Sequence, residues 1–326
     1  MKKRKFDLNH ITRQLVCACP LLILQAASAT DTHITGSTQT PVTLGAGDAL
    51  YVDVGGSLIS SGSTEVTATG DASIYIDGRV GYSSNDKDTS DYGNSVYLEG
   101  NNYVNISNTG IVMANENRGN AIYIESGDNT IDNMGDIGVI NDTQIAAKGI
   151  KISPTAGKTT INNGKDGVIT GASGAIYVDS GTQEDSGMLE VNNDGIIISS
   201  SNGAGIAINS SSNVEIDNSQ SGQIVGTFYG IYMNASGGHM DINNEGVIEG
   251  TNDTGYGYGI DVNRGSADIV NDGLISGGEK EDGSGRFSSI YLATGGNTVT
   301  LGTGSQVEGS INSAHSLNTI TLTGTS

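Results

Sequence analysis

The chain repeats a short strand pattern in which an apolar, a variable and a second apolar residue follow one small residue. Side chains alternate across a strand, so the two apolar residues of each copy are predicted to face inward and the middle residue outward. The copies recur at intervals of about 22 to 30 residues. Their leading residues are Leu50, Ile74, Val96, Ile122, Ile150, Ile176, Ile206, Ile231, Ile260 and Ile290. A strand repeated at this period is typical of a solenoid.

A second strand follows in seven copies and contains an asparagine, a turn, a glycine and, two residues later, valine or isoleucine. We interpret the asparagines as turn residues and expect their stacked amides to form a hydrogen-bonded ladder from coil to coil. They are Asn108, Asn133, Asn163, Asn193, Asn218, Asn244 and Asn271. Three short strands per coil predict an all-β, single-stranded parallel β-helix of about nine to ten coils of 22–30 residues.

Tyrosine is common at the outward position of the first strand, where Tyr51, Tyr75, Tyr97 and Tyr123 occupy four consecutive copies. We expect these rings to stack as an exposed ladder, each about one strand spacing from the next. Such rings either cover the sheet and add cross-strand contacts, or they form a rigid amphipathic stripe that binds glycans or a host protein.

The first 29 residues are predicted to be a signal peptide. Lys2–Lys5 and Arg13 form a basic segment, and Leu15–Ala27 supply an apolar core. The small residues before Thr30 predict cleavage between Ala29 and Thr30. Residues 30–69 are predicted to be degenerate N-terminal capping coils, and residues 70–326 to be the regular β-helix.

The chain is strongly acidic, with a formal net charge of −21, so nucleic acid is not an expected partner. Acidity also keeps a long, strand-rich body from pairing with its neighbours. Both cysteines, Cys17 and Cys19, lie in the predicted leader, so the mature chain would carry no disulfide.

No motif predicts an enzyme, a cofactor or a metal site. His239 and Arg264 lie near Asp241 and Asp261 in the sequence, but no motif joins them, and a surface histidine is the simplest interpretation. Gly255–Gly259, which alternates glycine and tyrosine, lacks the spacing and the following helix of a nucleotide loop.

Polar excursions interrupt the coils at 141–148, 179–187, 251–258 and 277–288, and loops of this kind are where function can be grafted. After Ile290 the pattern of Asn297–Leu301 recurs at Asn318–Leu322, and Ser326 lies inside a repeat. We therefore expect the β-helix to be truncated at its C-terminus.

The leader, the cysteine-free acidic body and the repeated Asn-turn-Gly strand together resemble the passenger domain of bacterial autotransporters, the pertactin-like type V secretion family. The resemblance implies a right-handed β-helix carried to the cell surface, or released there, by a C-terminal translocator β-barrel, which we expect only in the full-length gene product. It favours an adhesin-type scaffold that binds a host glycan or surface protein. The alternative is a carbohydrate-active β-helix enzyme, a polysaccharide lyase or hydrolase, which would need a groove with converging carboxylates and an arginine.

Overall fold

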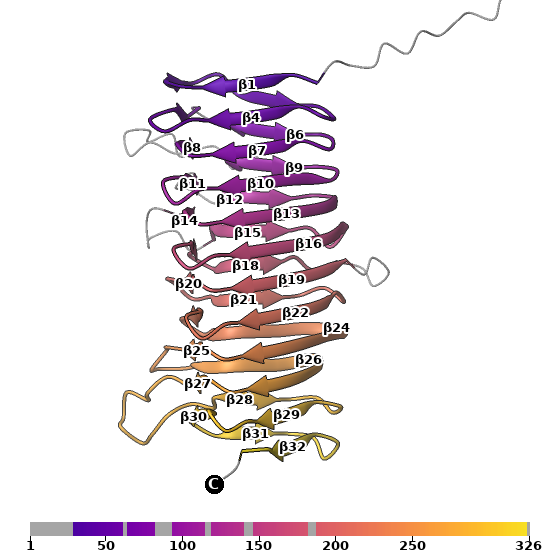
Figure 1. Ribbon diagram of the computed structural model, residues 1–326. Coiled ribbons are helices and arrows are strands. Elements are labelled where there is room, and N and C mark those ends of the chain that lie inside the picture. Colours follow the sequence, from indigo (N-terminus) through magenta and orange to yellow (C-terminus); the bar gives the residue numbers. More distant parts are fainter. Residues whose placement is uncertain are drawn as a thin grey trace, which may run out of the picture.

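The computed structural model describes residues 29–60, 64–81, 93–114, 119–139, 146–181 and 187–324. Within these ranges every regular element is a β-strand, and parallel strands stack into a β-helix (Figure 1). Each coil contributes one strand to each of three faces, which we call face 1, face 2 and face 3 in their order along the coil. The predicted fold class is confirmed.

Face 1 and face 3 belong to one 21-stranded sheet, and face 2 is a separate 11-stranded sheet. Face 1 consists of β1 (Asp31–Ile34), β4 (Ala49–Val52), β7 (Ser73–Ile76), β10 (Asn102–Ile106), β13 (Gly127–Asn133), β16 (Ala156–Asn163), β19 (Met188–Asn193), β22 (Asn213–Asn218), the second parts of β24 (Tyr229–Asn244) and β26 (Tyr258–Asn271), β29 (Thr298–Leu301) and β32 (Thr319–Leu322). Face 2 consists of β2 (Ser37–Thr38), β5 (Ser57–Leu58), β8 (Arg79–Gly81), β11 (Ile111–Ala114), β14 (Asp136–Val139), β17 (Val168–Gly171), β20 (Ile196–Ser199), β23 (Gln223–Gly226), β25 (Val247–Gly250), β27 (Leu274–Ser276) and β30 (Gln306–Glu308). Face 3 consists of β3 (Val42–Leu44), β6 (Val66–Ala68), β9 (Val96–Leu98), β12 (Asn120–Ile124), β15 (Lys148–Ile152), β18 (Gly174–Val178), β21 (Ala204–Ile208), the first parts of β24 and β26, β28 (Ile290–Leu292) and β31 (Ile311–Ser313).

The ten leading apolar residues all point into the core, and each is 0% exposed. The predicted inward orientation of these residues is therefore confirmed. Where glycine precedes the leader, at Gly149, Gly205, Gly230 and Gly259, the close approach of the backbone leaves no room for a Cβ. A Cβ on Gly230 would lie 2.6 Å from the carbonyl oxygen of Gly259 on the next coil, a distance that no side chain tolerates.

The leaders do not form one column, although they recur along the sequence as copies of one strand pattern. Ile74 on face 1 is in register with Val104 of β10, whereas Val96 lies on face 3 and is in register with Ile122. The interval from Ile74 to Val96 therefore separates two faces of one coil. The pattern misleads because Val104-Asn105-Ile106 also reads apolar, variable, apolar, and alternation decides which side of the sheet a residue faces but not which sheet it joins.

An asparagine ladder runs through the core side of face 1 over six coils. The Nδ2 of each member except the last donates to the Oδ1 of the next asparagine at 2.7 to 2.8 Å. The last member, Asn271, donates to Ser305 Oγ, and all six residues are 0 to 1% exposed. The members, which we call the Asn ladder, are Asn133, Asn163, Asn193, Asn218, Asn244 and Asn271. The expected coil-to-coil amide ladder is thus present for these six residues.

Asn108 is not part of the ladder, which corrects the prediction for that residue. It is exposed in the turn after β10, and Ile106 occupies the position in register with Asn133. The six ladder asparagines also end strands rather than occupy turns. Their role is hydrogen bonding inside the core, because each amide offers both a donor and an acceptor along the axis.

The glycine after each ladder asparagine is required for space. A Cβ on Gly222 would lie 2.3 Å from the carbonyl oxygen of Asn193. Gly222 is not among the glycines with positive φ, so the constraint is the close approach of the coils rather than an unusual backbone conformation.

Residues 31–68 form β1 to β6, which stack in register with the regular coils. At the ladder position this region carries Ile34 and Val52, which are apolar. The predicted leader, residues 1–28, lies outside the described residues, which begin with Ala29 and Thr30. The described part contains no helix with the length and hydrophobicity of a membrane span.

Candidate functional site

Two of the polar excursions meet at the corner between face 2 and face 3. Residues 251–257 connect β25 to β26, and residues 277–289 connect β27 to β28 on the next coil. The loops are joined by backbone hydrogen bonds, because Gly278 N donates to Gly257 O at 2.7 Å and Glu281 N donates to Asp253 O at 3.0 Å. Two segments that are distant in the sequence therefore form one surface.

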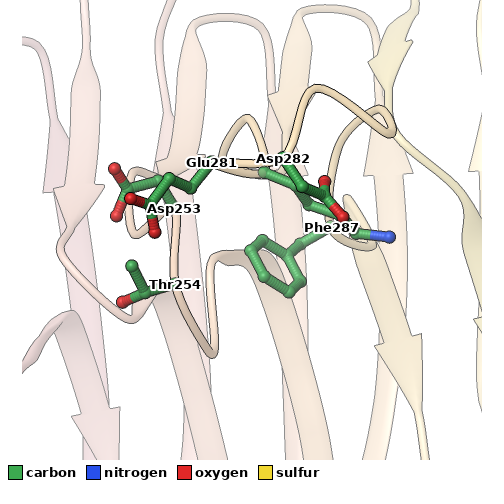
Figure 2. A pocket seen from close by; sticks show the side chains of 6 residues that line it. Asp253, Thr254, Glu281, Asp282 and Phe287 are labelled. Carbon is green, nitrogen blue, oxygen red and sulfur yellow. The ribbon is translucent and has the colours of Figure 1, made fainter.

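A pocket of about 510 Å³ opens between these loops (Figure 2). Its walls combine carboxylates, a hydroxyl, an ammonium group and one aromatic ring. The lining residues are Asp253, Thr254, Lys280, Glu281, Asp282 and Phe287. The ammonium nitrogen of Lys280 lies 5.5 Å from the ring centroid of Phe287. The pocket therefore offers hydrogen-bond acceptors around an apolar wall, a combination typical of ligand sites.

Arg286 holds the second loop against the sheet. Its guanidinium lies 3.1 Å from Glu279 and 3.1 Å from Glu308, and it donates to the carbonyl oxygen of Gly277 at 2.9 Å. Asp282 accepts hydrogen bonds from Ser284, and these bonds lower the pKa of its carboxyl. The loop thus has internal contacts that maintain the shape of the pocket.

An aromatic cluster lies beside the pocket and shares Phe287 with it. Its ring centroids are 4.6 to 6.3 Å apart, and the contacts form one continuous network. The members, which we call the aromatic cluster, are Phe228, Tyr229, Tyr232, Tyr256, Tyr258, Phe287 and Tyr291. Tyr256 is the most accessible of them, with 57% of its surface exposed. The cluster and the pocket together form the candidate site.

Asp261 lies within this cluster, in register between Tyr232 on one coil and Tyr291 on the next. The residue is only 5% exposed, and its Oδ1 atom has no hydrogen-bond partner in the described structure. Burial raises the pKa of Asp261 to about 7, since desolvation disfavours the charged carboxylate. Burial is also the main cause of the raised pKa of Tyr258, with the charge of Asp261 next.

The four tyrosines predicted to form one ladder instead form two separate pairs. Tyr51 and Tyr75 stack on face 1 with centroids 4.9 Å apart, and His33 stacks on Tyr51 at 4.6 Å. Tyr97 and Tyr123 lie on face 3 and meet edge to face at 5.7 Å. The continuous ladder of four rings is therefore wrong, for the same reason that the leaders divide between faces.

The sequence interpretation missed the aromatic cluster, although signals for it were present. Both loops interrupt the repeat as polar excursions, and Gly255–Gly259 alternates glycine and tyrosine without the spacing of a nucleotide loop. Its tyrosines, Tyr256 and Tyr258, both belong to the cluster. Strand register brings them to Tyr229, since Tyr229 pairs with Tyr258.

The two histidine-proximal acids of the sequence lie on different faces. His239 and Asp241 are on face 1, whereas Asp261 is on face 3, so these residues do not form one acid-base site. His239 instead contacts Asp241 and Asp268.

Comparisons with protein-family models, with curated proteins and with solved structures find no match to this chain.

Proposed function

We propose that the chain is the exported passenger of an autotransporter-like surface protein and acts as an adhesin-type scaffold, with the aromatic cluster and its pocket as the binding surface. The observation that carries this proposal is the gathering of seven aromatic rings beside a pocket with three carboxylates. The signal pattern of residues 1–29 supports export. A translocator β-barrel belongs to the proposed full-length gene product.

A glycan is the ligand that this chemistry fits best. Aromatic rings supply large contact area at little entropic cost, and their π faces favour the slightly positive C–H groups of a sugar ring. The carboxylates of Asp253, Glu281 and Asp282 accept hydrogen bonds from hydroxyl groups. Paired strands of adjacent coils hold Tyr229 and Tyr258, and backbone hydrogen bonds join the two loops that carry the carboxylates. An anionic glycan would be repelled, so neutral or cationic sugars are the favoured class.

The proposal is tested by glycan-array binding of the full chain and a Tyr256→Ser variant. Tyr256 is exposed, so its replacement removes a contact ring with little effect on folding. We expect at least tenfold weaker binding to any glycan that the parent retains. The matched control removes two rings elsewhere on face 3 by Tyr97→Thr and Tyr123→Thr. If the control loses binding and Tyr256→Ser retains it, the binding surface is not the aromatic cluster.

A carbohydrate-active enzyme is the second candidate, and Asp261 is the observation that favours it. A buried carboxyl with a raised pKa beside aromatic rings resembles a general acid in its physical properties. Incubating polysaccharides with the full chain and measuring new reducing ends or unsaturated products separates the candidates. Product formation that Asp261→Asn abolishes would support the enzyme, and its absence with retained binding would support the adhesin.

A further inference from the structure

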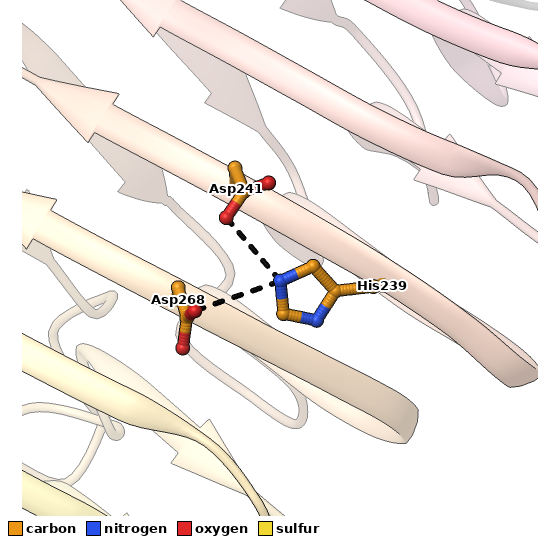
Figure 3. A group of neighbouring side chains, drawn as sticks. All are labelled: His239, Asp241 and Asp268. Carbon is orange, nitrogen blue, oxygen red and sulfur yellow. Dashed lines mark hydrogen bonds and ion pairs between the residues drawn. The ribbon is translucent and has the colours of Figure 1, made fainter.

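We propose that His239, Asp241 and Asp268 form a binding site for a divalent transition-metal ion on the outer side of face 1 (Figure 3). One atom of each residue can act as a ligand, and these three atoms all lie within 4.8 Å of one another. The ion class is one that accepts both imidazole and carboxylate, with Zn²⁺ as the type case. This site does not depend on the proposed function.

Strand register places the three side chains together. Asp241 on β24 pairs directly with Asp268 on β26, and His239 pairs with Ser266 two residues earlier on the same strands. His239 and Asp241 therefore project from the same side of one strand, and Asp268 projects beside them from the next coil. Ligands on neighbouring strands of a rigid sheet are preorganised, which reduces the entropy lost on binding.

The distances suit a tetrahedral ion. The Nε2 atom of His239 lies 3.2 Å from Asp241 Oδ1 and 3.6 Å from Asp268 Oδ2. Metal–ligand distances of about 2.1 Å at tetrahedral angles separate neighbouring ligand atoms by about 3.4 Å. Both observed separations lie close to that value, so small side-chain rotations would seat an ion. The residues are half-exposed, which leaves a fourth position for water or for a ligand.

Neighbouring hydroxyl groups orient two of the three ligands. Ser266 Oγ lies 2.8 Å from Nδ1 of His239, so it can accept a hydrogen bond from a protonated Nδ1 and leave Nε2 free to bind the ion. Thr298 donates to Oδ1 of Asp268, so Oδ2 remains directed at His239. Such outer contacts accompany most histidine and carboxylate metal ligands, because they fix the ring orientation and the tautomer.

The local charge also favours a cation. In-register carboxylates form a column along face 1 from Glu190 through Glu215 to Asp241 and Asp268. Lys158 pairs with Glu190 at 2.7 Å, which neutralises one end of the column. Like charges that are directly opposite each other on neighbouring strands destabilise a sheet. At the other end the imidazole of His239 contacts both Asp241 and Asp268. A bound divalent ion would offset the repulsion between these two carboxylates more strongly than the imidazole does.

Isothermal titration calorimetry with Zn²⁺ on the full chain tests the site. The measurement uses a Cys17→Ser, Cys19→Ser background, because thiols in the leader would bind the same ion. We expect one Zn²⁺ per chain, about tenfold or more weaker binding after His239→Asn, and weaker binding after Ser266→Ala through loss of ring orientation. His315→Asn, which removes an exposed histidine on a later coil, is the matched control and should bind as the parent does.

Unfolding in the presence of Zn²⁺ gives a second measurement. The thermal midpoint of the parent should rise with Zn²⁺ concentration, because the ion binds only the folded arrangement, and the midpoint of His239→Asn should not. Equal affinities of the parent and His239→Asn would overturn the proposal and indicate diffuse binding by the acidic surface. Absence of binding by a folded parent would also overturn it and leave His239 as a polar contact of the two carboxylates.

Discussion

Replacing Asn218 with alanine removes the centre of the Asn ladder and should strongly destabilise the β-helix. Its Oδ1 accepts from Asn193 Nδ2 at 2.8 Å, and its Nδ2 donates to Asn244 Oδ1 at 2.7 Å. The same Nδ2 lies 3.2 Å from the carbonyl oxygens of Gly222 and Val247. All of these contacts are inside the core, where Asn218 is 1% exposed.

The magnitude follows from the groups left without a partner. Alanine leaves the amide nitrogen of Asn193 and the amide oxygen of Asn244 without their ladder bonds, and a buried polar group without a partner costs about 1 to 3 kcal/mol. Asn193 Nδ2 retains a long contact of 3.3 Å to the carbonyl oxygen of Gln223, which reduces the part of the destabilisation that comes from Asn193. We therefore expect a loss of about 2 to 5 kcal/mol in the free energy of unfolding.

Equilibrium urea unfolding, followed by far-ultraviolet circular dichroism, measures this change on the full chain. Asn108→Ala is the matched control, because Asn108 occupies the same sequence motif but is exposed outside the ladder. The control should change the free energy of unfolding by less than about 0.5 kcal/mol. Equal unfolding midpoints for Asn218→Ala and Asn108→Ala would refute the ladder as a source of stability.

Three further outcomes are expected. Ile231→Asp places an unpaired carboxylate at a fully buried position and should cost several kcal/mol, so an unchanged unfolding midpoint would contradict the inward assignment. Burial raises the pKa of Asp261 from 3.8 to about 7, so the folded state binds this proton more tightly than the unfolded state does. The contribution of Asp261 to stability is therefore full below about pH 4 and is lost as the pH rises through about 7. Asp261→Asn should remove that part of the pH dependence in urea unfolding measured from pH 4 to 8, and an unaltered profile would count against the burial of the charge. Exported protein should begin at Thr30 when its N-terminus is sequenced, whereas an intact Met1 on a periplasmic or surface species would show that the leader is retained.

The inside and outside of each coil could be predicted from the sequence because they depend on local alternation. An apolar, variable, apolar strand must bury its first and third residues wherever it lies in the solenoid. Each of the ten leaders, Ile231 among them, is buried for this reason. The period of the repeat likewise follows from the chain length needed to complete one coil, and it was sufficient to predict a parallel β-helix.

The face on which a strand lies was decided only by the tertiary structure. Tyr75 and Tyr97 occupy the same pattern in the sequence, yet they lie on faces 1 and 3, because face assignment depends on the lengths of the connections between strands. Asn108 illustrates the same limit, since Ile106 rather than Asn108 comes into register with Asn133.

The candidate sites also required the fold, because register along the helix axis unites residues from different coils. Tyr229 and Tyr258 are far apart in the sequence but lie in register on adjacent strands, and the loops that bear Asp253 and Glu281 meet beside them. Asp241 and Asp268 likewise become neighbours through one strand pairing. Local sequence determined which side chains face outward, and the stacking of the coils determined which of them meet, because that depends on the length of every turn between them.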